Sequence, residues 1–159
     1  MNIRSTAKAI IIKDGRILLN KCADKKNGDY YSLPGGGQHQ YETLHQAIIR
    51  ECLEETGYTV IPARFAALCE EICMDEDFRE QYPDYAHKMY HIFVCELEDN
   101  ERQFPTEKDD MQINSEWIKT DILKQIRILP KVFGDCINDI LNNRAPIFLG
   151  SEHVYFNHG

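Results

Sequence analysis

The chain has 159 residues, of which 43% are hydrophobic, and its formal charge at pH 7 is −8. This length suffices for one domain with a sizeable core, so we expect a single domain over residues 1–159. The negative charge argues against loose binding to a nucleic acid polymer or an anionic membrane surface, because both require a basic patch.

The six cysteines are scattered, and no two of them form a CxxC pair. This spacing favours buried thiols over a zinc site or a disulfide framework. The sequence also begins without an apolar leader, and its apolar runs are too short to span a bilayer. We therefore expect a cytoplasmic protein.

The first predicted elements are two strands at residues 6–13 and 16–22. Asp14-Gly15 separates them and is a strong signal for a tight hairpin turn, so the strands should be antiparallel neighbours. A short extended segment follows at residues 30–33 and ends before Pro34. Three consecutive glycines at positions 35–37 then allow the backbone to turn and to approach a ligand closely.

A capped helix is predicted to begin near Leu44. Thr43 and Gln46 have the spacing of a capping box, and Gly57 supplies the end of the helix. Ile48, Ile49, Cys52 and Leu53 fall on the arc of this helix that would pack into a core.

Three glutamates share one face of this helix. Glu51, Glu54 and Glu55 stand at i, i+3 and i+4, and clustered carboxylates repel one another unless a positive charge lies among them. Arg50 can pair with Glu54, but one such pair contributes only about 0.2–0.5 kcal/mol. A hard divalent cation, Mg²⁺ or Mn²⁺, is the natural partner of such a cluster, and no basic cluster elsewhere in the sequence offers another. The alternative is a solvated acidic helix face.

Residues 36–58 as a whole resemble the Nudix box, GX5EX7REUXEEXGU, in which U is a bulky aliphatic residue. The matching positions are Gly36, Glu42, Arg50, Glu51, Glu54, Glu55 and Gly57. Cys52 and Tyr58 stand at the two U positions and depart from the pattern, but both can be buried as apolar groups.

After the helix, residues 59–73 form one long predicted strand or two strands broken by Pro62. Glu70 and Glu71 lie on it, and a solvent-facing position is the commoner interpretation for both. Residues 74–88 form a long polar loop that contains three aromatic residues, Phe78, Tyr82 and Tyr85. These rings could stack on a nucleobase or anchor the loop to its own domain.

The rest of the chain alternates between strands, a loop and a helix. Residues 89–97 form a buried strand, in which His91 is interpreted as a structural histidine. Residues 98–110 form an acidic loop, residues 111–118 a strand, and residues 129–142 a core-facing helix that begins after Pro130. Residues 145–159 are predicted to be a short frayed or extended tail, from about residue 146.

The alternation of strands and packing helices predicts an α/β fold with a mixed sheet, and the resemblance implies the α/β/α sandwich of the Nudix family. It also implies hydrolysis of a diphosphate linked to another moiety, with Glu51, Glu54, Glu55 and the carbonyl of Gly36 as metal ligands. Arg50 would orient the carboxylates. In many Nudix enzymes a glutamate outside the box is the general base, and Glu107 is the first candidate here.

The resemblance leaves the substrate open. Some subfamilies carry a proline or a tyrosine at a set distance after the box, but this chain has Met74, Asp75 and Glu76 there. The partner is expected to be a small-molecule diphosphate, such as a sugar nucleotide or a nucleoside triphosphate. A homodimer is compatible with the family. The competing function is a Nudix-fold regulatory protein that binds a nucleotide without cleaving it.

Overall fold

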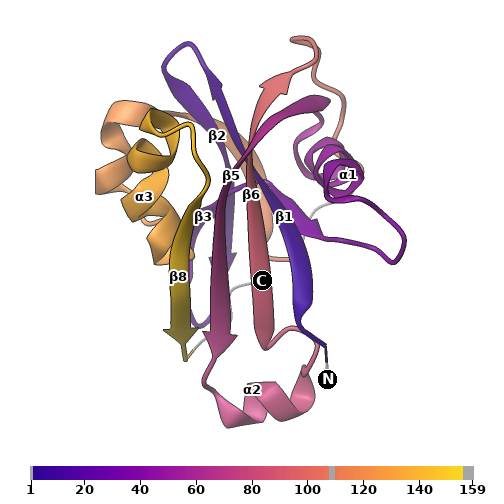
Figure 1. Cartoon of the computed structure of the whole chain (residues 1–159), viewed down its shortest axis with the longest axis vertical. Coiled ribbons are helices and arrows are strands. Elements are labelled where there is room, and N and C mark those ends of the chain that lie inside the picture. Colours follow the sequence, from indigo (N-terminus) through magenta and orange to yellow (C-terminus); the bar gives the residue numbers. More distant parts are fainter. Residues whose placement is uncertain (1, 108–109, 156–159) are drawn as a thin grey trace.

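A mixed β-sheet runs through the centre of the protein, with α1 and α3 on either side and α2 at one end (Figure 1). The computed structural model describes residues 2–107 and 110–155. The strands are β1 (Arg4–Lys13), β2 (Arg16–Asp24), β3 (Gly28–Ser32), β4 (Gly35–Gly37), β5 (Val60–Cys73), β6 (His87–Leu97), β7 (Gln112–Lys119) and β8 (Ile147–Val154). The helices are α1 (Leu44–Thr56), α2 (Glu76–Gln81), a 3₁₀ helix η1 (Thr120–Gln125) and α3 (Lys131–Asn142).

The strand order is β3-β2-β1-β6-β5-β8, with β4 paired to β1 and β7 paired to β2. The β1–β6 and β5–β8 pairs are parallel, whereas the others are antiparallel. The predicted α/β fold with a mixed sheet is confirmed. No helix among residues 2–107 and 110–155 is long and apolar enough to cross a membrane.

The predicted hairpin between β1 and β2 is also confirmed. Asp14 and Gly15 both have positive φ, as a two-residue hairpin turn requires. The two strands pair only near the turn, at Ile12–Ile17 and Lys13–Arg16. Farther from the turn, β1 pairs with the glycine strand β4 on one side and with β6 on the other. The first residues of β1 therefore lie next to the glycine strand.

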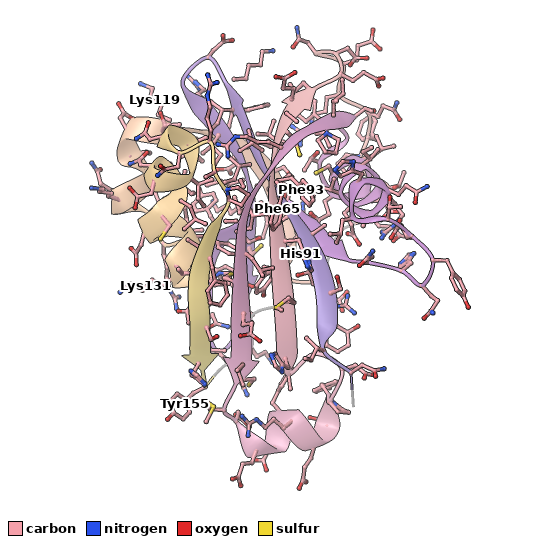
Figure 2. The ribbon with its side chains drawn as sticks, viewed as in Figure 1. Phe65, His91, Phe93, Lys119, Lys131 and Tyr155 are labelled. Carbon is pink, nitrogen blue, oxygen red and sulfur yellow. The ribbon has the colours of Figure 1, made fainter. Side chains whose placement is uncertain are left out.

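Hydrophobic residues pack on both faces of the sheet. One cluster joins α1 to the sheet through Ala47, Ile48 and Cys52, and the other joins α3 through Phe133, Ile137 and Ile140. Figure 2 shows Phe65, His91 and Phe93 close together on β5 and β6, and the rings of Phe65 and Phe93 are 5.4 Å apart. The buried thiol of Cys52 confirms that a cysteine at the first U position packs as an apolar group.

Segment 59–73 is one long strand, the first of its two predicted alternatives, whereas segment 74–88, predicted as a loop, contains a short helix. Pro62 does not divide the first segment, because β5 continues through it with shifts in its pairing to β6 near Pro62 and Phe65. Within the second segment, Asp75 caps the short helix α2 by accepting a hydrogen bond from the Phe78 backbone N–H at 2.9 Å.

The predicted solvent-facing position of Glu71 is wrong. Its residue exposure is 2%, and its carboxylate lies 3.3 Å from the Lys88 ammonium and 3.3 Å from the Tyr90 hydroxyl. The alternation of the strand places Glu71 inward with Cys69 and Cys73. Burial raises the pKa of Glu71 and lowers that of Lys88, while each partner opposes the shift of the other.

The predicted tail is also corrected over most of its length. Residues Ile147–Val154 form β8, which pairs in parallel with β5 and gives hydrogen-bonding partners to a strand that would otherwise be an open edge. The Ser151 hydroxyl donates to a Glu70 carboxylate oxygen at 2.6 Å. Residues 156–159 lie outside the described residues.

Candidate active site

Helix α1 carries the acidic residues, and both of its predicted ends are confirmed. The Gln46 backbone N–H donates to Thr43 Oγ1 at 3.1 Å, and the Thr43 N–H donates to Gln46 Oε1 at 2.8 Å. Gly57 ends the helix with φ 77°, and its N–H donates to the Leu53 carbonyl at 2.9 Å. These caps fix the rotation of α1 and hence the directions of its glutamates.

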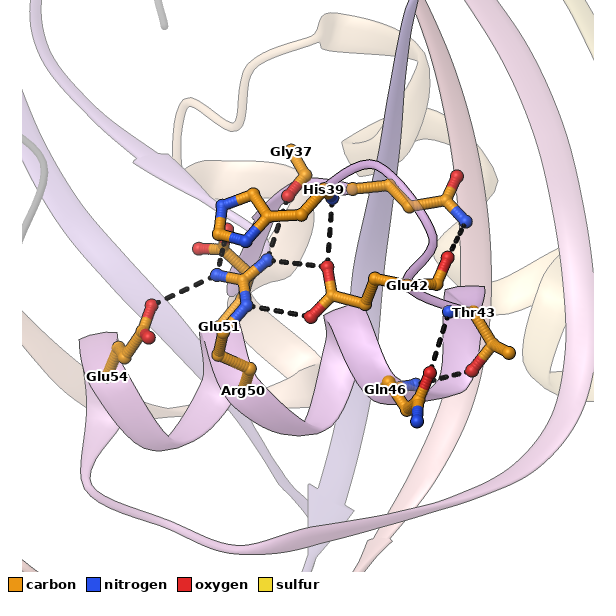
Figure 3. A network of polar contacts seen from close by, with 9 residues as sticks. Gly37, His39, Glu42, Thr43, Gln46, Arg50, Glu51 and Glu54 are labelled. Atoms are coloured by element: carbon orange, nitrogen blue, oxygen red, sulfur yellow. Dashed lines mark hydrogen bonds and ion pairs between the residues drawn. The ribbon is translucent and has the colours of Figure 1, made fainter.

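Arg50 is the centre of a polar network at the glycine strand (Figure 3). Its Nε and Nη2 donate to the two carboxylate oxygens of Glu42 at 2.8 and 2.9 Å. Its Nη1 donates to Glu51 Oε1 at 2.8 Å and to Glu54 Oε2 at 3.1 Å, and Nη2 also reaches the Gly37 carbonyl at 3.0 Å. Arg50 thus orients three carboxylates, as the resemblance implied, rather than forming one weak pair.

The charges of this network do not balance. Hydrogen bonding to Arg50 holds the pKa of Glu42 at about 2, well below its ordinary value, and the hydrogen bonds to Glu42 and then Glu51 raise the pKa of Arg50. One guanidinium faces the carboxylates of Glu42, Glu51 and Glu54. The network is therefore net negative, which favours a further cation.

Glu55 does not join Glu51 and Glu54. Its residue exposure is 4%, and Oε2 accepts hydrogen bonds from Asn20 Nδ2 and from the Gly35 backbone N–H, both at 2.8 Å. Among residues 2–107 and 110–155, no group of three His, Cys, Asp or Glu side chains is placed to hold a metal ion. In this conformation Glu55 fixes the glycine strand against α1.

The remaining donors fit a hard divalent cation. A Cβ added to Gly36 would lie 2.5 Å from Glu51 Oε2, so the missing side chain leaves the space in which this carboxylate rests against the backbone. The carboxylates of Glu51 and Glu54, with the nearby carbonyl of Gly36, form an oxygen-only donor set of the kind that Mg²⁺ and Mn²⁺ prefer. Glu55 could contribute only after releasing the Gly35 N–H.

A cavity of about 500 Å³ opens next to Glu51. Its lining residues are Arg4, Thr6, Lys8, Gly35, Gly36, Gly37, Glu51, Phe78, Tyr82, Tyr85, Tyr90, Asp110 and Met111. The aromatic residues of segment 74–88 therefore lie in the same cavity as Glu51. The rings of Phe78 and Tyr82 are 5.2 Å apart, and Tyr82 and Tyr85 are partly exposed.

Two basic residues of this cavity were missed by the sequence interpretation, which found no basic cluster elsewhere in the sequence to balance the glutamates. Arg4 and Lys8 both come from β1 and line the cavity with Thr6. The signal was the spacing of Arg4 and Lys8, which are four positions apart in β1 and therefore share a face, since residues two apart in a strand do so. Only the pairing of β1 with β4 shows that this face meets the acidic helix.

The candidate base Glu107 lies beside α1. Its backbone N–H donates to the Glu54 carbonyl at 3.1 Å, and its side chain is exposed. Asp110, from the same acidic loop, lines the cavity itself. The His91 ring donates from Nδ1 to the Thr6 carbonyl at 3.1 Å, as suits a structural histidine.

The protein has an α/β fold, in which helices flank a mixed sheet. Its candidate metal site is rich in oxygen atoms and lies where the acidic helix α1, with its carboxylates held by Arg50, meets the glycine strand β4. The NUDIX domain matches residues 3–133. The chain therefore belongs to the Nudix family of hydrolases, whose members generally use divalent metals.

Solved structures agree with this assignment at the level of the fold. A NUDIX hydrolase from Nitrosomonas europaea has a TM-score of 0.71 and 19% identity, with 89% of this chain and 90% of that chain covered. A UDP-X diphosphatase has a TM-score of 0.66 and 17% identity, with 93% and 67% covered. An ADP-ribose pyrophosphatase from Streptococcus suis 89-1591 has a TM-score of 0.63 and 19% identity, with 95% and 100% covered. No curated protein matches the chain.

Proposed function

We propose that this chain hydrolyses a pyrophosphate bond in a nucleoside diphosphate linked to another moiety, of the sugar nucleotide or nucleoside triphosphate class. The observation that carries the proposal is the cavity, which joins Glu51 and the glycine strand to Phe78, Tyr82 and Tyr85. Carboxylates at one end suit a metal-bound phosphate, and aromatic rings at the other suit a nucleobase. The names of the UDP-X diphosphatase and the ADP-ribose pyrophosphatase are compatible with this class.

The cofactor in this proposal is Mg²⁺ or Mn²⁺. When bound, it would neutralise charge on the phosphoryl oxygens and lower the pKa of a water molecule. Glu51 and Glu54 would hold it with the carbonyl of Gly36, and Glu55 would join them after a change of rotamer. Arg50 Nη1 contacts both carboxylates and so keeps Glu51 and Glu54 near one another.

The general base is proposed to come from the acidic loop, with Glu107 as the first candidate. Its backbone lies against α1, but its carboxylate would have to turn toward the cavity. Asp110 already lines the cavity and is the alternative. Glu107→Gln should lower kcat and leave metal affinity almost unchanged, with Asp110→Asn assayed alongside. Full activity in Glu107→Gln together with loss in Asp110→Asn would transfer the role to Asp110.

The test of the proposed function is a panel of sugar nucleotides, other nucleoside diphosphate derivatives and nucleoside triphosphates, assayed with Mg²⁺ and with Mn²⁺. Glu54→Gln and Glu55→Gln are compared with Glu96→Gln, a matched change at an exposed position of β6. We expect turnover in the wild type and in Glu96→Gln, with losses of roughly 100-fold or more in the other two. Turnover that survives both box substitutions would contradict the metal assignment. Tight binding without turnover would favour the regulatory function.

A further inference from the structure

Two cations of β1 lie in the cavity. Arg4 and Lys8 both line it and are half-buried. Elsewhere, Lys88 pairs with Glu71, and Arg50 contacts three carboxylates. Within the part of the chain that the structure describes, neither Arg4 nor Lys8 forms an ion pair. Their positive charges are therefore available to a ligand of the opposite sign.

The Arg4 guanidinium is held between the glycine strand and an aromatic ring. Its Cζ atom lies 4.5 Å from the centroid of the Tyr85 ring, which is a cation–π distance. A Cβ at Gly37 would collide with the guanidinium, so only glycine allows this approach. The guanidinium has five N–H donors, and among the described residues none of them has a hydrogen-bond acceptor. It is thus positioned by packing, with a planar set of donors left for an anion.

Lys8 lies nearer to the acidic end of the cavity. Its ammonium donates to the Gly35 carbonyl, which holds it beside the strand against which Glu51 rests. An ammonium has three donors, and this contact uses one. Lys8 is four residues from Arg4 along β1, so their Cα atoms are about 13 Å apart. The two side chains therefore border the space between Glu51 and Tyr85.

Arg4 and Lys8 bring positive charge into a cavity whose lining also carries the carboxylates of Glu51 and Asp110. With a formal charge of −8, the molecule repels anions at long range. Arg4 and Lys8, which form no ion pair among residues 2–107 and 110–155, offset this repulsion locally by offering positive charge to an anion in the cavity. Guanidinium groups match phosphate oxygens in bidentate geometry, and ammonium groups bind them as point charges.

We propose that Arg4 and Lys8 form a phosphate-binding site that works without a metal ion. The site would hold a phosphate group on the aromatic side of Glu51, and the ligand would be either a nucleotide phosphate or inorganic pyrophosphate. Its physiological role rests on the proposed function, because the phosphate would belong to the substrate or the product. The anion binding itself does not depend on hydrolysis.

The test is calorimetric titration of the full-length protein with inorganic pyrophosphate and with nucleoside monophosphates, in buffer containing EDTA. Arg4→Gln and Lys8→Gln should each weaken binding by about tenfold, because each removes charge-assisted hydrogen bonds. Lys13→Gln is the matched control, since Lys13 lies on the same strand but bonds Asn100 Oδ1 at the exposed end. It should bind as the wild type does. Tighter binding of nucleoside monophosphates than of pyrophosphate assigns the site to nucleotides, and the reverse assigns it to pyrophosphate.

Misfolding is separated from loss of the site by two further measurements. Thermal unfolding of each variant should match the wild type within a few degrees, and Arg4→Lys should restore part of the affinity lost in Arg4→Gln because it keeps the charge. Wild-type affinity in both glutamine variants, or no binding by the wild type in EDTA, would overturn the proposal. If no substrate is hydrolysed but binding depends on Arg4 and Lys8, the proposed function fails and this inference stands.

Discussion

At the scale of single residues, neighbouring glutamates of one helix have different surroundings. Glu54 is partly exposed and contacts Arg50, whereas Glu55 is buried and bonds Asn20 and the Gly35 N–H. The two residues are neighbours in the Nudix box, and both carry a carboxylate. The difference arises because consecutive helical positions are rotated by about 100°, which directs Glu55 toward the glycine strand.

Glu54→Gln and Glu55→Gln are therefore expected to differ in stability although both lower activity. Glu55→Gln replaces a buried charged acceptor, and the loss of its charge-assisted bonds should cost about 1.5–3 kcal/mol in the free energy of unfolding. Glu54→Gln should change it by less than about 0.5 kcal/mol. Urea denaturation of both variants without metal measures the difference. Equal stabilities would show that Glu55 is not held as described.

Glu42 gives a prediction for pH. Its pKa in the folded protein is about 2, against an ordinary value of 4.5, because Arg50 bonds both of its oxygens. A lowered folded-state pKa means that the pairing stabilises the protein fully above pH 4.5 and that this contribution is lost as the pH falls toward 2. Glu42→Gln should thus unfold more easily than the wild type above pH 4.5, with the difference shrinking in acid. Denaturation curves on both sides of that pH, with Glu96→Gln as control, measure it; a constant difference would contradict the assignment.

At the scale of elements, the caps of α1 fix the position of the acidic face. Both bonds of the capping box are formed, and Thr43 Oγ1 satisfies the Gln46 N–H. Thr43→Ala should lower the free energy of unfolding by about 1 kcal/mol, whereas Thr43→Ser should keep most of it because serine caps equally well. Urea denaturation checks this. An alanine variant as stable as the serine variant would mean that the cap contributes nothing.

Elements set by local chemistry could be predicted from the sequence. The Asp14-Gly15 turn, the capped helix and α3 depend on residues close together in the chain, and all three are confirmed. The features that could not be predicted depend on contacts between residues that are far apart in the sequence. No pattern of nearby residues indicates that β8 pairs with β5. The same holds for the hydrogen bond between Asn20 and Glu55, which are 35 positions apart in the sequence. The cavity is a further case, because β1, α1 and segment 74–88 meet there only after the sheet has formed.

At the scale of the whole molecule, two hydrophobic clusters share one sheet. α1 packs on one cluster and α3 on the other, and strands β1 and β6 contribute residues to both. This arrangement supports the proposal that the chain is a single cooperative domain, because a loss on either face should weaken the common sheet.

Ile137→Ala tests this cooperativity across the sheet. Ile137 is a buried residue of α3, and its truncation should lower the free energy of unfolding by about 2–5 kcal/mol. The one tryptophan, Trp117, packs against the opposite cluster, and its fluorescence should report the same lowered midpoint as far-ultraviolet circular dichroism. Ile113→Ala, at a position that is 51% exposed, is the control. Separate transitions for the two probes would contradict a single domain.

Hydrolysis at phosphorus is the central claim, and isotope labelling tests it most directly. The substrate with the highest turnover in the panel is hydrolysed in ¹⁸O-labelled water with Mg²⁺, and the masses of the products are measured by mass spectrometry. We predict one ¹⁸O atom in a phosphate-containing product of the wild type and at least about 100-fold less labelled product from Glu54→Gln. No labelled phosphate product from the wild type, or equal labelling by Glu54→Gln, would contradict it.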